Sequence, residues 1–280
     1  MRRIFRIFAN DMELQENSII VSDRLDGVFD VELRNHFTHA YCTAGECEMT
    51  YNGEGIRVAK GDCMIIIANQ LVTAIRPSEN FRVKVIYIEV GFLEACTPHT
   101  SYGVTGGLTM FVNPVMHLDE REQWLCERDF DEVAQRLREP HRYFQGDAMM
   151  AVTQTMFCDF YEFHARIYGQ PQVSALTASV MKRFIDMLER GDYRRSREVG
   201  YYADKLCVTP KYLSEVCRKV SGYSANFWIN RYATIDIARL LRDKSLSLTD
   251  IADMYGFTSQ SHFTRYVQQN LGATPSVFRS

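Results

Sequence analysis

The feature that most constrains the fold of this chain is an internal repeat near its C-terminal end. Placing Ala203 on Ala252 aligns the following residues at an offset of 49, and one inserted residue then makes the offset 50, so that Gly222 falls on Gly272. Each copy predicts a short helix, a tight turn and a second helix that ends at a glycine. Roughly the last hundred residues are therefore expected to hold one helix-turn-helix unit twice.

Capping residues support the helix boundaries in both copies. Thr209-Pro210 gives the second helix of the first copy a capping oxygen and a proline at the first helical position, where its missing N–H has no consequence. In the second copy, Thr249-Asp250 and Ser259 are the predicted caps of the two helices. The same boundaries are thus predicted twice, from the periodicity and from the caps.

The turns and the connecting helix add to the pattern. Gly256 lies at the turn of the second copy, where a residue without Cβ takes a positive φ easily, and Cys207 lies at the same place in the first. Between the copies a helix is expected from Ser224 to about Lys244, and at about 1.5 Å per residue it spans on the order of 30 Å. Adjacent major grooves on one side of B-DNA are about 34 Å apart. Two second helices at this spacing can enter both grooves.

The charge is divided between the two parts of the chain. The net charge of −3 over 280 residues alone argues against a nucleic-acid binder. Residues 179–280, however, hold 16 of the 32 basic and only 10 of the 35 acidic residues, a net of +6, which leaves −9 for the rest. A basic part attached to an acidic one is typical of a nucleic-acid-binding module joined to another domain.

Several short motifs carry a resemblance to a known family. They are Tyr202-Ala203-Asp204-Lys205-Leu206, Thr209-Pro210-Lys211-Tyr212-Leu213, Ser221-Gly222, Ile251-Ala252, Gly256-Phe257, Ser261-x-Phe263-x-Arg265 and Gly272-x-Thr274-Pro275. Through them, residues from about 181 to 280 resemble the DNA-binding domain of AraC/XylS-family transcription regulators. The resemblance implies a sequence-specific regulator that acts as an activator rather than a repressor. One departure is Val267-Gln268, where the family usually has Phe-Lys, which implies one fewer phosphate contact.

The predicted DNA-binding residues lie on the polar faces of the two second helices, opposite Leu213 in one and Phe263 in the other. They are Pro210, Lys211, Ser214, Glu215, Arg218, Gln260, Ser261, His262, Thr264, Arg265 and Gln268. The family resemblance implies base contacts near Lys211, Ser214, Gln260, Ser261 and Arg265. Arg and Lys pair with guanine and Gln with adenine, whereas hydroxyls often contact phosphate, so for each residue a phosphate contact or plain exposure stays an alternative. Lys219, Arg231 and Arg242 are expected to be solvated or to contact phosphate.

The first 170 residues are expected to form a separate domain that is rich in strands. Between Val28 and Val90, short β-branched and aromatic stretches alternate with turn residues, and Asn52-Gly53 predicts a type I′ hairpin. Helices follow from Asp119 to about Arg138 and from about Asp147 to Tyr168. The predicted organisation is a domain over 1–170, a linker over 171–178 and a DNA-binding domain over 179–280. The wide apolar stripe of the second helix either packs onto the barrel or forms a homodimer surface.

The strand-rich segment looks similar to the cupin-like sensor domain common in this family. The predicted fold class is thus α+β with two domains: a cupin-like antiparallel β-barrel with trailing helices, followed by an all-α double helix-turn-helix. His36 and His39 lie where metal-binding cupins place histidines, but no third ligand follows, so no metal, no cofactor and no enzymatic activity are expected. Candidates for lining an effector site in the barrel mouth, or for a plain core, are Tyr41, Met49, Tyr51, Met64, Ile66 and Tyr87.

The main hypothesis is a cytoplasmic, homodimeric, effector-responsive transcription regulator. Its expected partners are double-stranded DNA, a small-molecule effector and RNA polymerase, and no apolar run is long enough to cross a membrane. Three alternatives remain: a ligand-independent dimeric regulator, a thiol sensor that uses Cys42 and Cys47, and a metal-dependent cupin enzyme with an attached DNA-binding part. Reduced thiols packed in the core are expected for most of the eight cysteines.

Overall fold

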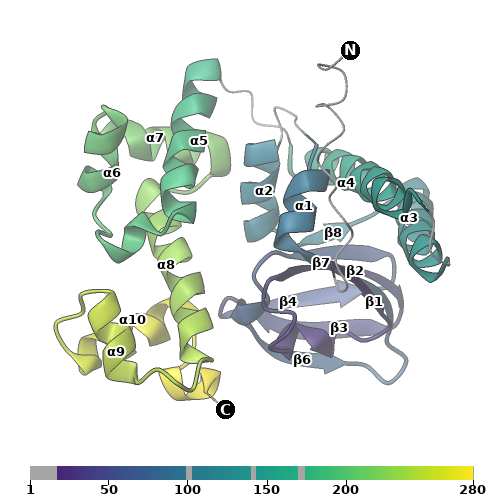
Figure 1. Ribbon diagram of the computed structural model, residues 1–280, viewed down its shortest axis with the longest axis horizontal. Coiled ribbons are helices and arrows are strands. Elements are labelled where there is room, and N and C mark those ends of the chain that lie inside the picture. The colour runs from purple at the N-terminus through teal and green to yellow at the C-terminus, as the bar shows by residue number, and fades with distance from the viewer. Residues whose placement is uncertain (1–17, 99–102, 140–142, 170–173, 280) are drawn as a thin grey trace.

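The computed structural model describes residues 18–98, 103–139, 143–169 and 174–279. It divides into an N-terminal region (residues 18–169) and a C-terminal region (residues 174–279), which lie side by side (Figure 1). Residues 1–17 of the predicted first domain, and residues 171–173 of the predicted linker, lie outside the described residues.

The N-terminal region is built on two antiparallel sheets. One has the strand order β1-β7-β2-β5-β8 and the other β4-β3-β6. The strands are β1 (Ile19–Ser22), β2 (His36–Ala44), β3 (Glu46–Tyr51), β4 (Glu54–Ala59), β5 (Asp62–Ile66), β6 (Val72–Pro77), β7 (Arg82–Glu89) and β8 (Val115–His117). The predicted antiparallel, barrel-like domain is confirmed.

The hairpin between β3 and β4 shows how local chemistry sets the register. Asn52 and Gly53 both have positive φ, 58° and 77°, as the predicted type I′ turn requires. The turn pairs Tyr51 with Glu54 and Met49 with Ile56. Because side chains alternate along a strand, Tyr51 and Met49 point into the core between the sheets.

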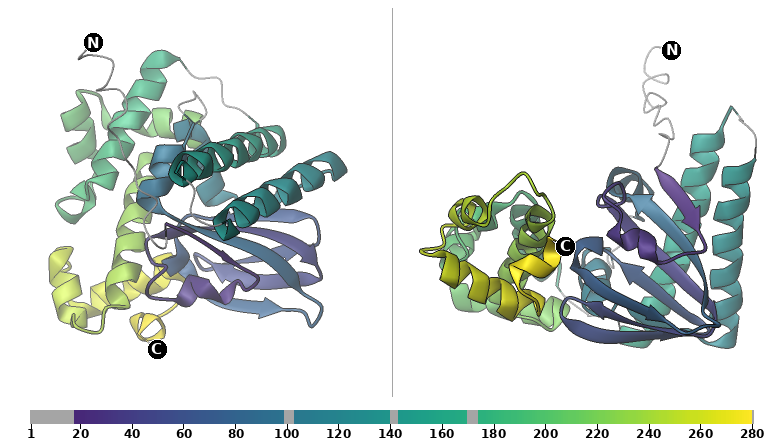
Figure 2. Two further views of the ribbon diagram at one scale, coloured as in Figure 1. Left: turned by 45° about the vertical axis from the view of Figure 1, so that its right-hand side comes forward. Right: turned by 90° about the horizontal axis from the view of Figure 1, so that it is seen from below.

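Helices cover the outer face of the larger sheet. Three short elements precede them: η1 (Asp26–Phe29), η2 (Asn69–Leu71) and α1 (Val90–Cys96). The others are α2 (Gly103–Val112), α3 (Glu120–Arg138) and α4 (Gln145–Tyr168). Asp119 caps α3 in a reciprocal pair with Glu122, as the sequence indicates. Figure 2 shows α3 and α4 as a pair on the side of the sheet away from the C-terminal region.

The apolar stripe of α4 packs inside the chain. Met149, Met156, Phe160 and Phe163 are buried in a second core with residues of the sheet and of α3. Of the two interpretations left open for this stripe, packing onto the barrel therefore holds for these residues. The outer face of α3 carries Trp124, which is 64% exposed.

The C-terminal region is helical. Its elements are α5 (Ala175–Glu189), η3 (Asp192–Arg194), α6 (Val199–Leu206), α7 (Pro210–Ser221), α8 (Ala225–Leu241), α9 (Leu248–Met254), α10 (Gln260–Leu271) and η4 (Pro275–Phe278). Two boundary predictions need correction. α5 begins at Ala175, inside the predicted linker. The cap of α9 is Ser247, whose Oγ accepts a hydrogen bond from the Asp250 N–H, and not Thr249, which lies one residue inside the helix.

Most other predicted caps are in place. The Thr209 hydroxyl accepts from the Tyr212 N–H, with Pro210 at the first helical position, and the Ser259 hydroxyl accepts from the His262 N–H. α7 and α10 both end at a glycine in the left-handed conformation. The repeat in the sequence is thus two copies of the same local structure, α6–α7 and α9–α10, joined by α8.

Candidate DNA-binding surface and domain interface

The second helices of the two units, α7 and α10, present polar faces to solvent. Their buried faces are formed by Leu213, Val216, Cys217 and Val220 in α7 and by Phe263, Val267 and Leu271 in α10. All eleven predicted DNA-binding residues are exposed, except Ser214 and Thr264, which are half-buried. The arrangement leaves amide, hydroxyl, imidazole and guanidinium groups available for base edges and phosphates.

The tight turns of the two units have the same unusual backbone. Gly256 has a φ of 64° and Cys207 a φ of 57°, so both lie in the left-handed region. A side chain in this region is strained, which Gly256 avoids and Cys207 does not. The equivalence inferred from the repeat therefore holds at the backbone level.

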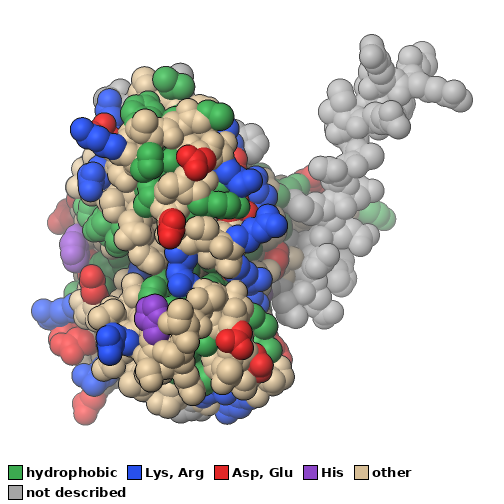
Figure 3. Space-filling view, turned by 90° about the vertical axis from the view of Figure 1, so that its left-hand side faces the viewer, with side chains coloured by type: hydrophobic (Ala, Val, Ile, Leu, Met, Phe, Trp, Pro, Cys, Tyr) green, Lys and Arg blue, Asp and Glu red, His purple; other side chains and the backbone are tan. Residues whose placement is uncertain are grey.

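Figure 3 shows the face of the C-terminal region that is turned away from the N-terminal region. Much of this face consists of backbone and uncharged side chains, with hydrophobic and a few acidic side chains among them, and Lys and Arg side chains lie along its margins and in the seam between its upper and lower halves. The barrel does not cover it. A ligand approaching this face would meet the two units without displacing the N-terminal region.

The six candidate effector residues are all buried, but they do not share one environment. Met49, Tyr51, Met64, Ile66 and Tyr87 belong to the core between the two sheets. Tyr41 belongs to the core between the larger sheet and the helices, with its ring 6.2 Å from that of Phe130. The placement of Tyr41 in the barrel interior was wrong, because it has the opposite parity to Ala40 and Cys42, the inward residues of β2.

The two regions meet where α8 closes one end of the barrel. The Arg231 guanidinium lies 4.4 Å from the centre of the Phe111 ring, and Phe111 in turn contacts Tyr51 and Trp228. Arg231 is only 8% exposed and Tyr51 only 3%. Within the part of the chain that the structure describes, neither Arg231 Nε nor the Tyr51 hydroxyl has a hydrogen-bond partner. An unpaired cation and an unpaired hydroxyl thus face the same apolar junction.

Burial changes the acid–base behaviour of these two groups. It lowers the pKa of Arg231 to about 10, although Tyr51 and Glu54 act in the opposite direction. It raises the pKa of Tyr51. Burial therefore disfavours the charged form of both groups, and none of the described carboxylates forms a salt bridge with Arg231.

The expectation that Arg231 is solvated was wrong, and Arg242 is also less exposed than expected. Arg242 is half-buried, and its Nη2 donates to the Val72 carbonyl at 3.0 Å. The signal that identifies Arg231 is the composition around it. α8 carries buried apolar or small residues on several faces, among them Trp228, Ala233 and Ile237, so a polar residue within it is buried as well.

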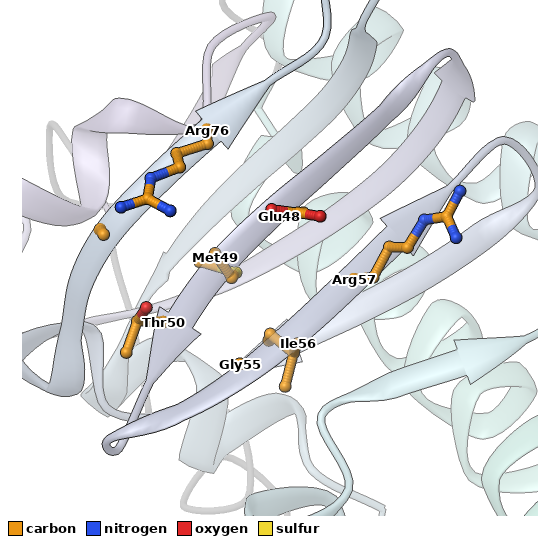
Figure 4. Close-up of a pocket in the computed structure, with 8 residues that line it drawn as sticks. Glu48, Met49, Thr50, Gly55, Ile56, Arg57 and Arg76 are labelled. Carbon is orange, nitrogen blue, oxygen red and sulfur yellow. The ribbon is translucent and has the colours of Figure 1, made fainter. Parts of the chain in front are cut away.

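A shallow depression lies on the solvent face of the smaller sheet (Figure 4). It measures about 370 Å³ and is lined by Glu48, Met49, Thr50, Gly55, Ile56, Arg57, Ala74 and Arg76. Glu48 pairs across the strands with Arg57 and Arg76, and Thr50 with Gly55 and Ala74. Small side chains in one row beside long charged ones in the next produce the hollow. In Figure 4 the two arginines point away from each other, so the row does not converge on one point.

His36, His39, Cys42 and Cys47, the candidates for a metal site and a thiol sensor, are all buried, and of the eight cysteines only Cys158 and Cys207 are exposed. His36 and His39 are three residues apart on β2, so they point to opposite faces of the sheet and cannot bind one ion together. His39 stacks on Phe157 and Phe160, and burial lowers its pKa to about 4. Burial raises the pKa of Cys42 to about 11 and also raises that of Cys47. Thiols with raised pKa values are poor nucleophiles at neutral pH.

Comparison with known proteins identifies both regions. Residues 26–148 match the model of an AraC-like ligand binding domain, and residues 202–280 match that of a helix-turn-helix domain. The chain is 31% identical over 82 residues to the probable transcription factor PqrA of Proteus vulgaris, a stretch that covers 29% of this chain and 67% of PqrA. It is 34% identical over 71 residues to the transcriptional activator AarP of Providencia stuartii, covering 25% of this chain and 53% of AarP.

A solved structure shares the two-region fold. The unsaturated fatty acid bound, wild-type ToxT of Vibrio cholerae strain SCE256 matches with a TM-score of 0.51 and 12% identity, over 94% of this chain and 95% of ToxT. The class defined by the fold and by these matches is a helix-turn-helix regulator with an attached ligand-binding domain. The chain belongs to the AraC/XylS family of transcription regulators. None of the helices that the structure describes is both long and apolar enough to span a membrane.

Proposed function

We propose that this protein is a sequence-specific activator of transcription that binds adjacent major grooves through α7 and α10. The observation that carries the proposal is that both helices present polar side chains to solvent on equivalent faces, ten polar residues together with Pro210. Lys211 and Arg265 suit guanine, Gln260 suits adenine, and Ser214 and Ser261 suit either base or phosphate. The name of AarP as a transcriptional activator supports activation rather than repression.

Selection of bound sequences from a random duplex pool by the full-length protein tests this proposal. We expect two short conserved blocks separated by about one helical turn, because α8 joins two equivalent units. The matched control is a variant with Lys211→Ala and Arg265→Ala, which changes two exposed side chains and should remain folded. Recovery of one block only, or of the same sequences by the control, would contradict binding through both units.

We further propose that the effector is an acid with an apolar body, bound at the end of the barrel that α8 closes. The unpartnered Arg231 Nε and Tyr51 hydroxyl support a carboxylate there, and Met49, Met64 and Ile66 supply apolar surface behind it. The fatty acid named for ToxT is a molecule of this class. Since side chains fill this junction, an effector would bind best to an arrangement in which α8 has shifted, and it would thereby act on both units.

Thermal unfolding with an unsaturated fatty acid, kept below its micelle concentration, tests the effector proposal. A ligand at 100 times its dissociation constant adds about 2.7 kcal/mol to the stability of the native state. We expect stabilisation by the acid, less by the alcohol of the same chain, and none by the acid in Arg231→Met. Equal stabilisation by the acid and by the alcohol would contradict the binding of a carboxylate at this site. The absence of stabilisation by either compound would favour a ligand-independent regulator.

The remaining partners follow from the same proposal. A second copy of the chain and RNA polymerase are proposed on family membership, and the site of action is proposed to be the cytoplasm, where bacterial DNA lies. The thiol-sensor alternative, by contrast, is weakened by the raised pKa values of Cys42 and Cys47. An oxidant response that survives replacement of both by serine would remove it.

A further inference from the structure

The two helix-turn-helix units are separate in their main packing. α6 and α7 pack on each other, on α5 and on α8, whereas α9 and α10 pack on each other and on α8. A single connecting helix leaves the second unit free to tilt unless something else holds it. We propose that Arg197, in the segment before α6, is a positioning residue that locks the second unit at a fixed angle to the first and so sets the base-pair spacing the protein accepts. The part concerning DNA rests on the proposed function.

Arg197 reaches from the first unit to the turn of the second. Its Nη1 donates to the Tyr255 carbonyl at 2.9 Å, and its guanidinium lies 4.3 Å from the centre of the Phe257 ring and 5.4 Å from that of Tyr266. Tyr255 and Phe257 flank Gly256 in the turn, and Tyr266 belongs to α10. One side chain therefore contacts both the turn and the second helix of the other unit, from a position two residues before α6 begins.

A second set of contacts holds the same turn from the side of α8. The buried Asp236 carboxylate accepts from the Tyr255 hydroxyl at 2.6 Å, from Arg194 Nε at 2.6 Å and from Arg239 Nη2 at 2.7 Å. Burial acts to raise the pKa of Asp236, but these hydrogen bonds outweigh burial and lower it. The carboxylate is thus ionised at neutral pH and binds η3, α8 and the end of α9 together.

Tyr255 is the residue at which these contacts meet. Its carbonyl is bound by Arg197, its hydroxyl by Asp236, and its ring stacks on Tyr193 at 6.3 Å with the planes 7° apart. Contacts from three directions restrain the turn against tilt as well as against translation. Tyr193, Arg194 and Arg197 all come from the short segment between α5 and α6. This segment is therefore a brace, a second connection between the two units in addition to α8. Two connections fix the angle between the units, whereas one connection does not.

A phosphate contact is the competing role for Arg197, and chemistry separates the two. A phosphate needs only a positive charge, which lysine also supplies. Stacking on two rings while donating to a carbonyl needs the planar guanidinium, so lysine is a poor substitute there. If Arg197 positions the second unit, Arg197→Lys is therefore expected to behave like Arg197→Met, which removes the contacts. If Arg197 contacts phosphate, Arg197→Lys is expected to behave like the wild type. Arg195→Met, an exposed change in the same segment, is the matched control.

The first test uses no DNA. Spin labels are placed on the exposed Lys219 of α7 and Gln269 of α10 of the full-length protein, as unnatural amino acids that spare the cysteines, and their distance distribution is measured by pulsed electron paramagnetic resonance. We expect one narrow distribution in the wild type and in Arg195→Met, and a broader one in Arg197→Met and Arg197→Lys, with thermal unfolding showing that all four are folded. Unchanged width in Arg197→Met, or a broad wild-type distribution, overturns the proposal.

The second test uses the sequence recovered by selection, with its native spacing and with one base pair inserted, which moves the blocks about 3.4 Å apart and turns them by about 35°. We expect the wild type to prefer native spacing strongly. Arg197→Met should bind the native site about tenfold more weakly and lose most of its preference over the inserted site. An equal loss on both sites makes Arg197 a phosphate contact and overturns the positioning role. If the wild type binds no selected sequence, the proposed function fails while the distance measurement still decides the brace.

Discussion

Replacing Arg231 with methionine is expected to stabilise the protein, although it removes a buried contact. Burial lowers the pKa of Arg231 from its ordinary value to about 10. At 1.36 kcal/mol for each pH unit, keeping this side chain charged in the native state costs on the order of 3 kcal/mol. A base with a depressed pKa destabilises the native state at every pH below about 10, and the penalty disappears only when the pH exceeds the ordinary pKa of arginine.

Part of this penalty is offset by the ring beneath the cation. The guanidinium lies 4.4 Å from the centre of the Phe111 ring, and a desolvated cation–π contact contributes about 1–2 kcal/mol. Methionine has a similar length, no charge and favourable contacts with aromatic rings. The expected net effect of Arg231→Met is therefore an increase of about 1–2 kcal/mol in the free energy of unfolding, in line with other buried charges replaced by apolar residues.

Urea-induced unfolding of the full-length protein at neutral pH, followed by circular dichroism and by tryptophan fluorescence, measures this change. Trp228 lies beside Phe111 at the junction, so its fluorescence follows the loss of the interface. Arg218→Met, at an exposed position of α7, is the control and should change stability by less than about 0.5 kcal/mol. A loss of stability in Arg231→Met would refute the reasoning, because it would mean that a partner compensates the buried charge.

Four further substitutions test three other features. Cys207→Gly should raise the free energy of unfolding by about 0.5 kcal/mol, since it relieves a φ of 57° but frees the unfolded chain, whereas Gly256→Ala should lower it by about 1 kcal/mol in the same denaturation assay. The pKa of His39 is about 4 in the folded state and 6.5 in the unfolded state. The burial of His39 therefore lowers the free energy of unfolding by about 3 kcal/mol as the pH falls from 6.5 to 4. The free energy of unfolding of His39→Phe should therefore rise by this amount relative to that of the wild type over the same pH range. Parallel curves of stability against pH would contradict the lowered pKa of His39. Arg265→Ala should weaken operator binding by about 1–3 kcal/mol and relax one base position in a competition assay, whereas a uniform loss on all sequences would mark a phosphate contact.

Local signals were sufficient for much of the fold. The helix-turn-helix boundaries could be predicted because the Thr209 and Ser259 hydroxyls accept hydrogen bonds from backbone N–H groups three residues on, and Pro210 has no N–H to satisfy. The β3–β4 hairpin follows from Asn52-Gly53 for the same reason, since its turn geometry needs only those two residues. The correspondence of Cys207 with Gly256 came from the repeat, and the backbone bears it out.

Features that depend on distant residues were not predictable. Tyr41 was placed on the wrong face because β2 is covered on both sides: its residues are buried or half-buried at every position, and polar and apolar residues do not alternate along it. The composition of α8 indicates that Arg231 is buried, but the residues around it, Tyr51 and Phe111, lie more than 100 residues away in the chain and have no local signal. The contacts of Arg197 with the second unit likewise have no local signature.

Two buried charged residues that hold other parts of the fold, Arg231 and Asp236, lie on the same helix. Arg231 and Asp236 are five residues apart on α8, which places them about 140° apart around its axis, so one faces the barrel and the other faces η3 and the second unit. A change at the barrel junction therefore cannot move α8 without also moving the carboxylate that holds Tyr255. The face of the C-terminal region that is turned away from the barrel stays uncovered (Figure 3), so the proposed control of DNA binding does not require the barrel to block that face. Under the proposed function, an effector at the barrel junction acts by shifting α8 and with it the contact of Asp236 with Tyr255, one of the contacts that fix the angle between the two units.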